Sequence, residues 1–470
     1  MKLFVLATLI APHATYATSM HRTSSDPRDF DADLNMPGFH FVPFPFDWQN
    51  DPNGPLYDPV HDKYHLFYQY QTPRLWGHAV SDDMVNWSQL PVAVGTDAWY
   101  DAGGVFSGSG TVLDDEDQSV VLTISSSDNR EIFVAVPKDR SDPNLVEWVL
   151  PDSNPIYNTT ARDPTEIFQT TDGRYRIADG TAEGSELWEC SGCEGVDDIV
   201  GGHKWEKIGM LQSKVEGQGY WECPDFFPLL GDGADEDVWV SKFSNTGDHW
   251  YTGAYDEDTG VFTPFDTEDR MYDQNTAFYA SKTFLDSRGG KERRILWGWL
   301  ISGKPEGSGW EGLQSVPRLV EGIEGTMLTT YPIPELEGLR EEEGAAKFED
   351  LAIREDGEVK QLDFEGRMFD VEAEVEVEGD GCGFRVLWDG ADAHLDVMID
   401  KGTTSVRMLV DSSVVETFFN GGRTSRTQFT QVTSKESVKV GLLGDGKVCN
   451  FNSLNLWKMS PYKFDATMVQ

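Results

Sequence analysis

The chain has 470 residues, of which 39% are hydrophobic and 12% aromatic, and its 81 acidic and 38 basic residues give a formal net charge of −43. This apolar content excludes a disordered chain, and the length favours two domains. A surface so acidic repels phosphate backbones and anionic lipid headgroups, which excludes nucleic acid and membrane surfaces as partners.

The first seventeen residues have the layout of a secretory signal peptide. A single basic residue, Lys2, precedes the apolar run 3–11, and small residues follow up to Ala17. The run is too short to span a bilayer. We therefore expect residues 1–17 to be a signal peptide and the protein to be secreted or vacuolar. The N-glycosylation sequons that begin at Asn86 and Asn158 agree with that route.

From residue 63 onward, short alternating or apolar runs are bounded by Gly, Asp, Asn and Ser, which is typical of successive β-strands. Helical periodicity is almost absent, so the region 38–335 is predicted to be all-β. Its length suits five four-stranded propeller blades, although the pattern alone also fits a large β-sandwich. The expected strands are 64–70, 119–125, 131–136, 238–243, 249–255, 277–284 and 294–301.

A second domain is predicted after Pro332 and Pro334, which interrupt strand pairing. Residues 335–343 are acidic, and we expect a briefly helical connector there. Beyond it, residues 345–465 alternate in the manner of a β-sandwich. The strands expected in this sandwich are 361–378, 383–388, 394–399, 405–419 and 437–443.

Five cysteines allow two disulfides and one free thiol in an exported protein. Cys190 and Cys193 lack a second pair at zinc-binding spacing, so a loop disulfide or two ordinary thiols is expected there and no metal site. Cys382 and Cys449, near either end of the C-terminal region, are candidates for a second bridge. Cys223 is left over.

Three acidic residues lie in motifs of aromatic, Pro and Gly residues. In WQNDPNGP (48–55), Pro52 fixes the backbone and the following Asn-Gly supplies a turn, so Asp51 projects from a rigid bend. In RDP (162–164), Arg162 can hold the carboxylate of Asp163 ionised or bind a ligand hydroxyl. Taken singly, each motif also fits a structural turn.

The third motif, WECPDFF (221–227), places Glu222 among apolar residues and a thiol. Such surroundings disfavour the ionised carboxylate, which suits a general acid. A buried, hydrogen-bonded structural glutamate is the alternative interpretation.

In this order, the three motifs resemble those of glycoside hydrolase family 32, which comprises invertases, inulinases, levanases and fructan hydrolases. The resemblance runs from about residue 41 to the end of the chain. Further segments similar to the family are FSGS at 106–109, YASKTF at 279–284, LQSVPR at 313–318 and DSSVVETFFNGGRT at 411–424.

This resemblance implies a five-bladed β-propeller followed by a β-sandwich, with the active site in a funnel at the propeller axis. Asp51 would attack the anomeric carbon of a terminal β-fructofuranosyl residue, Glu222 would act as general acid and then base, and Asp163 would bind ring hydroxyls. The reaction is a retaining double displacement that needs no cofactor and no metal. The implied sugar contacts are Asn50, Gln69, Trp76, Phe106, Ser107 and Arg162.

Two departures from the family pattern concern the substrate site. Only residues 71–75 remain where the family commonly has a longer loop with Asn-Pro and another Trp. We expect this shortening to remodel the pocket rim or the leaving-group subsite. Gln49 stands where many plant relatives have Met or Ser, which we interpret as a shift in donor or acceptor preference.

The leading interpretation is a β-fructofuranosidase acting on sucrose, with inulin and levan as further substrates. A fructosyltransferase and a non-catalytic fructan-binding protein stay open as alternatives, although the presence of Asp51, Asp163 and Glu222 together favours an enzyme. We expect a monomer or homodimer whose partner is a fructoside. Because Asp51 must be ionised and Glu222 protonated, activity is expected to be bell-shaped in pH with an acidic optimum.

Overall fold

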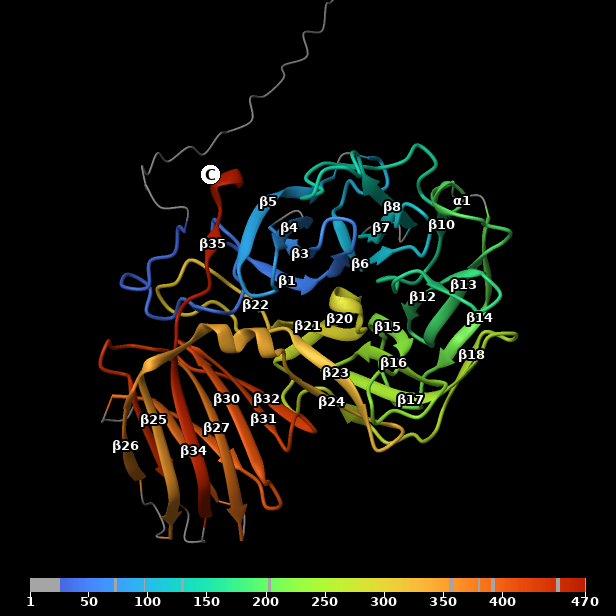
Figure 1. The fold of residues 1–470 in the computed structure, drawn as a ribbon. Coiled ribbons are helices and arrows are strands. Elements are labelled where there is room, and N and C mark those ends of the chain that lie inside the picture. Colours follow the sequence, from blue (N-terminus) through green and yellow to red (C-terminus); the bar gives the residue numbers. More distant parts are fainter. Residues whose placement is uncertain are drawn as a thin grey trace, which may run out of the picture.

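The structure is a computed structural model that describes residues 26–469 except 72–73, 97, 128–130, 202–203, 355–358, 379–380, 390–393 and 445–448. The predicted signal peptide, residues 1–17, lies outside the described residues. Figure 1 shows a ring of five small sheets above a two-sheet sandwich, so the predicted all-β fold with a five-bladed propeller and a β-sandwich is confirmed. Within the described ranges, no helix is long and apolar enough to cross a membrane.

The first two blades follow the chain from residue 49 to residue 158. In the first blade, the C-terminal strand β35 (Phe464–Asp465) runs parallel to β5, so the end of the chain returns to the beginning of the propeller. The strands of these blades are β1 (Gln49–Pro52), β2 (Leu56–Asp58), β3 (Lys63–Tyr70), β4 (Leu75–Ser81), β5 (Trp87–Val94), β6 (Val105–Val112), β7 (Val120–Ser126), β8 (Glu131–Pro137), β9 (Trp148–Val149) and β10 (Tyr157–Asn158).

The other three blades continue to residue 332, and their strands are again antiparallel. They consist of β11 (Phe168–Gln169), β12 (Tyr175–Thr181), β13 (Gly184–Cys190), α1 (Val196–Val200) and β14 (Trp205–Ser213), then β15 (Glu222–Pro228), β16 (Val238–Ser244), β17 (Asp248–Asp256), β18 (Val261–Pro264) and β19 (Arg270–Met271), then β20 (Phe278–Asp286), η1 (Arg288–Gly290), β21 (Arg293–Leu300), β22 (Leu313–Gln314), β23 (Arg318–Ile323) and β24 (Met327–Pro332). The seven strands predicted in the propeller region are confirmed as β3, β7, β8, β16, β17, β20 and β21.

The sandwich packs a six-stranded sheet on a four-stranded one. Two predicted strands, 361–378 and 405–419, are each a pair of strands, because the chain turns at 366–367 and again at Ser412, whose φ is 56°. The elements are η2 (Pro334–Leu339), β25 (Arg340–Ile353), β26 (Val359–Glu365), β27 (Met368–Val377), β28 (Cys382–Trp388), β29 (Leu395–Ile399), β30 (Ser405–Asp411), β31 (Val414–Phe419), β32 (Thr424–Phe429), β33 (Lys439–Leu443), β34 (Cys449–Met459) and, at the C-terminus, η3 (Thr467–Val469).

The acidic connector predicted at 335–343 is helical only as far as Leu339. From Arg340 the chain is already in β25, which pairs with β34 at Met459 and Lys458. The prediction was wrong for 340–343 because the acidic side chains there stay exposed while their backbone takes part in the sheet.

Apolar side chains of the propeller alternate between the two faces of each blade and pack against both neighbouring blades. In β3, Phe67 packs toward the second blade, whereas Leu66 and Tyr68 pack toward the fifth. In β15, Phe226 packs against the third blade and Phe227 against the fifth. Each blade is therefore apolar on both faces, and the ring is closed by five hydrophobic seams.

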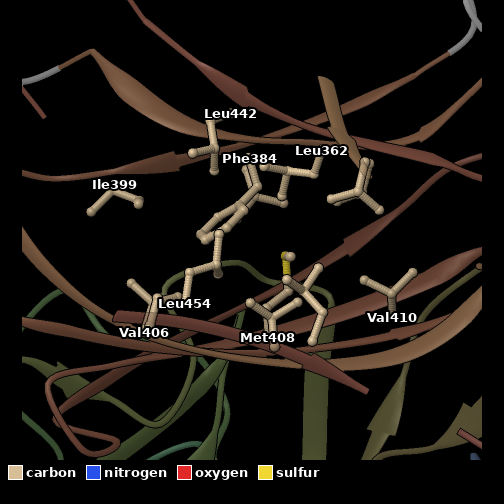
Figure 2. Packing of buried hydrophobic residues seen from close by; sticks show 14 of the residues in the cluster. Leu362, Phe384, Ile399, Val406, Met408, Val410, Leu442 and Leu454 are labelled. Atoms are coloured by element: carbon tan, nitrogen blue, oxygen red, sulfur yellow. The ribbon is translucent and has the colours of Figure 1, made fainter. Parts of the chain in front are cut away.

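The sandwich core lies between its two sheets, as Figure 2 shows. Phe384 and Leu442 from the four-stranded sheet and Met408 from the six-stranded one all point into this core. The predicted disulfide Cys382–Cys449 is confirmed and joins β28 to β34, so it links the two sheets covalently.

The remaining cysteines also follow the sequence prediction. Cys190 and Cys193 form the loop disulfide at the end of β13, and Cys223 is free and buried. The free thiol of the protein is therefore that of Cys223, the second residue of β15.

A buried charge cluster joins the sandwich to the propeller. His40 Nδ1 lies 2.8 Å from Asp411 Oδ2, and His40 Nε2 lies 2.9 Å from Glu416 Oε2. Glu416 also accepts a hydrogen bond from Arg318 in β23. Buried charges are stable only when they have such partners. Because the motif DSSVVETFF in the sandwich finds these partners in the propeller region, it connects the two domains.

His40→Gln is expected to destabilise the protein by about 3 kcal/mol near pH 6 and by much less above pH 9. Burial lowers the pKa of His40, but its hydrogen bonds to Asp411 and Glu416 outweigh burial and raise that pKa to about 9. A raised pKa stabilises the fold fully below the unfolded value of about 6.5, and this stabilisation is lost as the pH rises through about 9. Denaturant unfolding of both proteins at the two pH values measures the difference, and a difference independent of pH would contradict the assignment.

Candidate active site

A small cavity of about 140 Å³ opens at one end of the propeller axis. All five blades contribute to its wall, since most of the residues come from the beginnings of the innermost strands or from strands beside them, while Arg74 comes from the loop between β3 and β4. The lining residues are Asn50, Asp51, Gln69, Arg74, Phe106, Ser107, Arg162, Asp163, Glu222, Cys223, Tyr279 and Trp299.

Every innermost strand is interrupted where it reaches this cavity. In four blades the pairing register shifts by one residue there, and in the third blade a similar shift separates Arg162, paired with Gly180, from Thr165, whose N–H donates to Ala178. Such bulges re-aim side chains and are common beside active sites. The four other interruptions lie at 49–52 in β1, 105–108 in β6, 222–225 in β15 and 279–282 in β20.

Asp51 lies at the centre of the cavity wall, in the bulge of β1. Its Oδ2 accepts a hydrogen bond of 2.5 Å from Ser107 Oγ and a weaker one of 3.6 Å from Cys223 Sγ. Burial raises the pKa of Asp51 to about 6, and the negative charges of Asp163 and Glu222 act in the same direction, against the lowering effect of the Ser107 hydrogen bond. Asp51 is thus a buried carboxyl group whose ionised form is disfavoured in the free protein.

Glu222 is the first residue of β15, and its side chain is 30% exposed. Its carboxylate accepts hydrogen bonds from Arg162 and, at 2.6 Å, from the hydroxyl of Tyr279. The prediction of apolar surroundings was therefore wrong, because the bulge at 222–225 turns Glu222 toward the polar side of the cavity while Trp221 and Phe226 are buried.

Asp163 has a backbone φ of 60°, in the left-handed region that residues other than glycine seldom adopt. Its N–H donates to Ser125 Oγ, and its Oδ2 accepts from the N–H of Cys223 at 3.1 Å. This network fixes the carboxylate beside Asp51 and Glu222, and the strain is maintained by contacts from two neighbouring blades.

Arg162 connects two of the three acids. Its Nε lies 3.5 Å from Asp163 Oδ2, while another of its nitrogens binds Glu222. The guanidinium also stacks on the rings of Phe106 and Tyr220, with its central carbon 5.5 and 4.9 Å from the ring centres. Arg162 thus places one positive charge between two carboxylates and lines the cavity.

Eight of the nine residues predicted for the site line the cavity. Trp76 is the exception: it is fully buried in β4, and its Nε1 donates to the carbonyl of Phe106 at 2.9 Å. We therefore reassign Trp76 from a sugar contact to support of the β6 bulge. Trp76 lies on β4, the third strand from the axis in the first blade, and it reaches the β6 bulge of the second blade through this hydrogen bond.

Four lining residues were missed by sequence reasoning: Tyr279, Cys223, Arg74 and Trp299. Tyr279 begins the YASKTF segment, and Cys223 follows Glu222, so both stood in motifs that were recognised. Arg74 belongs to the shortened loop, and its guanidinium lies 4.9 Å from the centre of the Phe106 ring. In this loop the guanidinium of Arg74 therefore forms part of the cavity wall.

Known proteins share the sequence patterns and the fold of this chain. The family model described as "Glycosyl hydrolases family 32 N-terminal domain" matches residues 40–332, and "Glycosyl hydrolases family 32 C terminal" matches 384–458. The chain is 31% identical to an acid beta-fructofuranosidase of Vicia faba, across 90% of this chain and 80% of that protein.

Two further proteins extend the comparison. The chain is 35% identical to "Acid beta-fructofuranosidase 4, vacuolar" of Arabidopsis thaliana, over 72% of this chain and 55% of that protein. Its fold is similar to that of fructan 1-exohydrolase IIa from Cichorium intybus in complex with 1-kestose, with a TM-score of 0.78 and 26% identity over 92% of this chain and 99% of that one.

Proposed function

The chain belongs to glycosyl hydrolases family 32, and we propose that it hydrolyses terminal non-reducing β-fructofuranosyl residues of sucrose and of fructans. The observation that carries this proposal is the convergence of Asp51, Asp163 and Glu222 in one cavity at the propeller axis. Two carboxylates facing one cavity are the groups that glycoside hydrolysis requires. The relatives named acid beta-fructofuranosidase support the same reaction.

The proposed reaction is a retaining double displacement. Asp51 attacks the anomeric carbon of the fructosyl residue while Glu222 gives a proton to the departing glycosidic oxygen. A water molecule, deprotonated by Glu222, then attacks the same carbon and releases fructose and the free carboxylate of Asp51. Asp163, held rigidly by its contacts, accepts hydrogen bonds from the ring hydroxyls.

The size of the cavity favours cleavage at the end of a chain. A space of about 140 Å³ holds a single sugar ring, so the remainder of the substrate lies outside, toward Phe106 and Arg74 at the rim. Sucrose and terminal fructose units of inulin or levan satisfy this condition. Transfer to a sugar hydroxyl is the second candidate, because such a hydroxyl can take the place of water in the second displacement.

Incubation of the purified protein with sucrose, inulin and levan tests the proposal. Free fructose released from at least one substrate is the expected result, with trisaccharide a minor product even at high sucrose concentration. Trisaccharide as the main product would reassign the protein as a fructosyltransferase. Absence of any release from all three substrates would reassign it as a binding protein.

The free enzyme is expected to lose kcat/KM by about tenfold per pH unit below about pH 6, because Asp51 must be ionised to attack. Burial raises the pKa of Asp51 to about 6, so its reactive form disappears as the pH falls through that value. Initial rates at low sucrose concentration from about pH 4 to about pH 8 measure this limb. An acid limb near the ordinary value of 3.8 would contradict the burial of Asp51.

We propose that the protein follows the secretory pathway, as the layout of residues 1–17 and the vacuolar relative suggest. Only Asn158 is then expected to carry a glycan, because it is exposed on the edge strand β10. The amide of Asn86 instead donates to Asp83 at 2.7 Å and accepts from the N–H of Lys463 at 2.8 Å.

Expression in a glycosylating host, followed by enzymatic deglycosylation, measures the occupancy of the two sequons. Asn158→Gln is expected to abolish the mobility shift, whereas Asn86→Gln leaves it unchanged. A shift that survives in Asn158→Gln and is lost in Asn86→Gln would contradict this assignment.

A further inference from the structure

Two lysines are fully buried at the propeller axis, and the reaction described above does not use either of them. Lys282, on β20, donates from its ammonium group to the carbonyls of Pro164 at 3.1 Å and Pro224 at 2.7 Å. It therefore bridges the innermost strands of the third and fourth blades while belonging to the fifth.

Lys242, on β16, bridges the fourth and fifth blades in a similar way. Its ammonium donates to the carbonyls of Cys223 at 3.1 Å and Ser281 at 2.6 Å. Asp248 Oδ2 lies 3.3 Å from this ammonium and also accepts a 2.7 Å hydrogen bond from the N–H of Ser281. Asp248 thus holds Lys242 and the bulge of β20 together.

The four carbonyls that these lysines bind all lie within the interrupted positions of the innermost strands. Pro164 follows Asp163, while Cys223 and Pro224 follow Glu222. A bulge takes carbonyls out of the sheet pairing, and a buried carbonyl without a donor is costly. An ammonium group has three N–H donors, so one lysine can bind carbonyls from two strands.

Backbone strain is concentrated at the same positions. Asp163, Cys223 and Ala280 have φ values of 60°, 44° and 53°, all in the left-handed region. Residues other than glycine keep such conformations only where the surrounding contacts over-determine them. The lysine ammonium groups supply part of these contacts, because they bind the carbonyl of Cys223 and the carbonyls of the residues that follow Asp163 and Ala280.

The first two blades show the same arrangement with neutral donors. Gln314 Nε2 donates to the carbonyl of Asn50 at 2.6 Å, and Gln69 Nε2 donates to that of Val105 at 3.0 Å. Each of these contacts serves a single strand. The lysines occupy the half of the ring where Asp163, Glu222 and Tyr279 enter the cavity.

We propose that Lys282 and Lys242 are positioning residues for catalysis. They hold the bulges of the third, fourth and fifth blades, and so fix the carboxylates of Asp163 and Glu222 at reacting distance from the sugar ring. This inference rests on the proposed function. A shift of these groups by a fraction of an ångström reduces transition-state contacts more than initial binding, because the sugar contacts of the first two blades stay in place.

Lys282→Met and Lys242→Met, assayed as full-length proteins on sucrose, test the proposal. Each is expected to lower kcat at least about 10-fold with KM within about threefold of the wild-type value. Asp248→Asn, which is isosteric and keeps an acceptor for Ser281, is expected to lower kcat by a smaller factor. Lys282→Gln retains an amide donor and is expected to restore part of the kcat lost in Lys282→Met.

The matched control is Arg407→Met, which removes another buried cation, paired with Asp370 in the sandwich. It is expected to lower the melting temperature while kcat per folded molecule stays at the wild-type value. Wild-type kcat in folded Lys282→Met, or the same loss of kcat in Arg407→Met, would overturn the proposal. Where the methionine variants do not fold, wild-type kcat in both Asp248→Asn and Lys282→Gln would overturn it. Absence of hydrolysis by the wild-type protein would refute the proposed function instead.

Discussion

Asp51→Asn is expected to lower kcat for fructoside hydrolysis at least about 10³-fold and, at the same time, to make the folded protein more stable. Activity is lost because the amide cannot form the glycosyl ester. Its shape and the hydrogen bond from Ser107 can be retained, so the substrate is still expected to bind. Rates with sucrose, together with binding of fructose to the variant, measure the two effects separately.

The gain in stability follows from the raised pKa of Asp51. Burial, with Asp163 and Glu222 nearby, raises this pKa from 3.8 to about 6, so the fold favours the neutral carboxyl. That stabilisation is full below about pH 4 and is lost as the pH rises through about 6. At pH 7.5 the variant is thus expected to be more stable by up to about 3 kcal/mol, and at pH 4 the two proteins are expected to be equal.

Denaturant unfolding at these two pH values gives the free energies of unfolding. Asp232→Asn, at an exposed loop position, is the matched control and is expected to change neither activity nor stability. A variant that is less stable than the wild type at pH 7.5, or one that retains full kcat, would contradict the account of Asp51.

Glu222→Gln is expected to lower kcat for sucrose by about 10²- to 10⁴-fold, because the leaving glucose then departs without a proton. A fructoside with an acidic phenol as leaving group does not need that proton in the first step. The loss of the first-step rate is therefore expected to be much smaller for such a substrate than for sucrose. Pre-steady-state release of the phenol measures the first step directly.

Glu216→Gln is the matched control, since Glu216 is exposed and precedes Glu222 by only six residues. It is expected to behave as the wild type with both substrates. An equal loss for sucrose and for the aryl fructoside in Glu222→Gln would show that this residue acts in a step other than proton donation.

Most of the fold follows from patterns that are local in the sequence. Short runs such as 64–70 and 238–243 predicted strands, and both are confirmed, as β3 and β16. Each of these strands is apolar on both faces because it packs against a neighbouring blade on either side. The turn at Ser412 was not predicted, because residues 405–419 are apolar on both sides of it.

The site was predictable only in part. Residues in recognisable motifs, such as Asp51 and Ser107, lie in the cavity as expected. The direction of a side chain beside a bulge depends on the strand opposite, which is distant in the sequence. For this reason neither the polar surroundings of Glu222 nor the support given by Trp76 could be deduced from neighbouring residues.

The sandwich motif shows a different limit. Asp411 and Glu416 were recognised only as part of a similar segment, and no chemistry was assigned to them. Their partners, His40 and Arg318, lie far away in the chain. Only the folded structure brings these four charges together, and their role in joining the domains becomes visible there.

The measurement that tests the central claim most directly is peptide mapping, by mass spectrometry, of Glu222→Gln quenched during turnover of an aryl fructoside. The first step proceeds with this substrate, but the second is slow without the base, so a fructosyl ester is predicted to accumulate on the peptide that contains Asp51. An ester on Asp163 or on any other residue, or turnover with no ester while the anomeric configuration is inverted, would contradict the double displacement at Asp51.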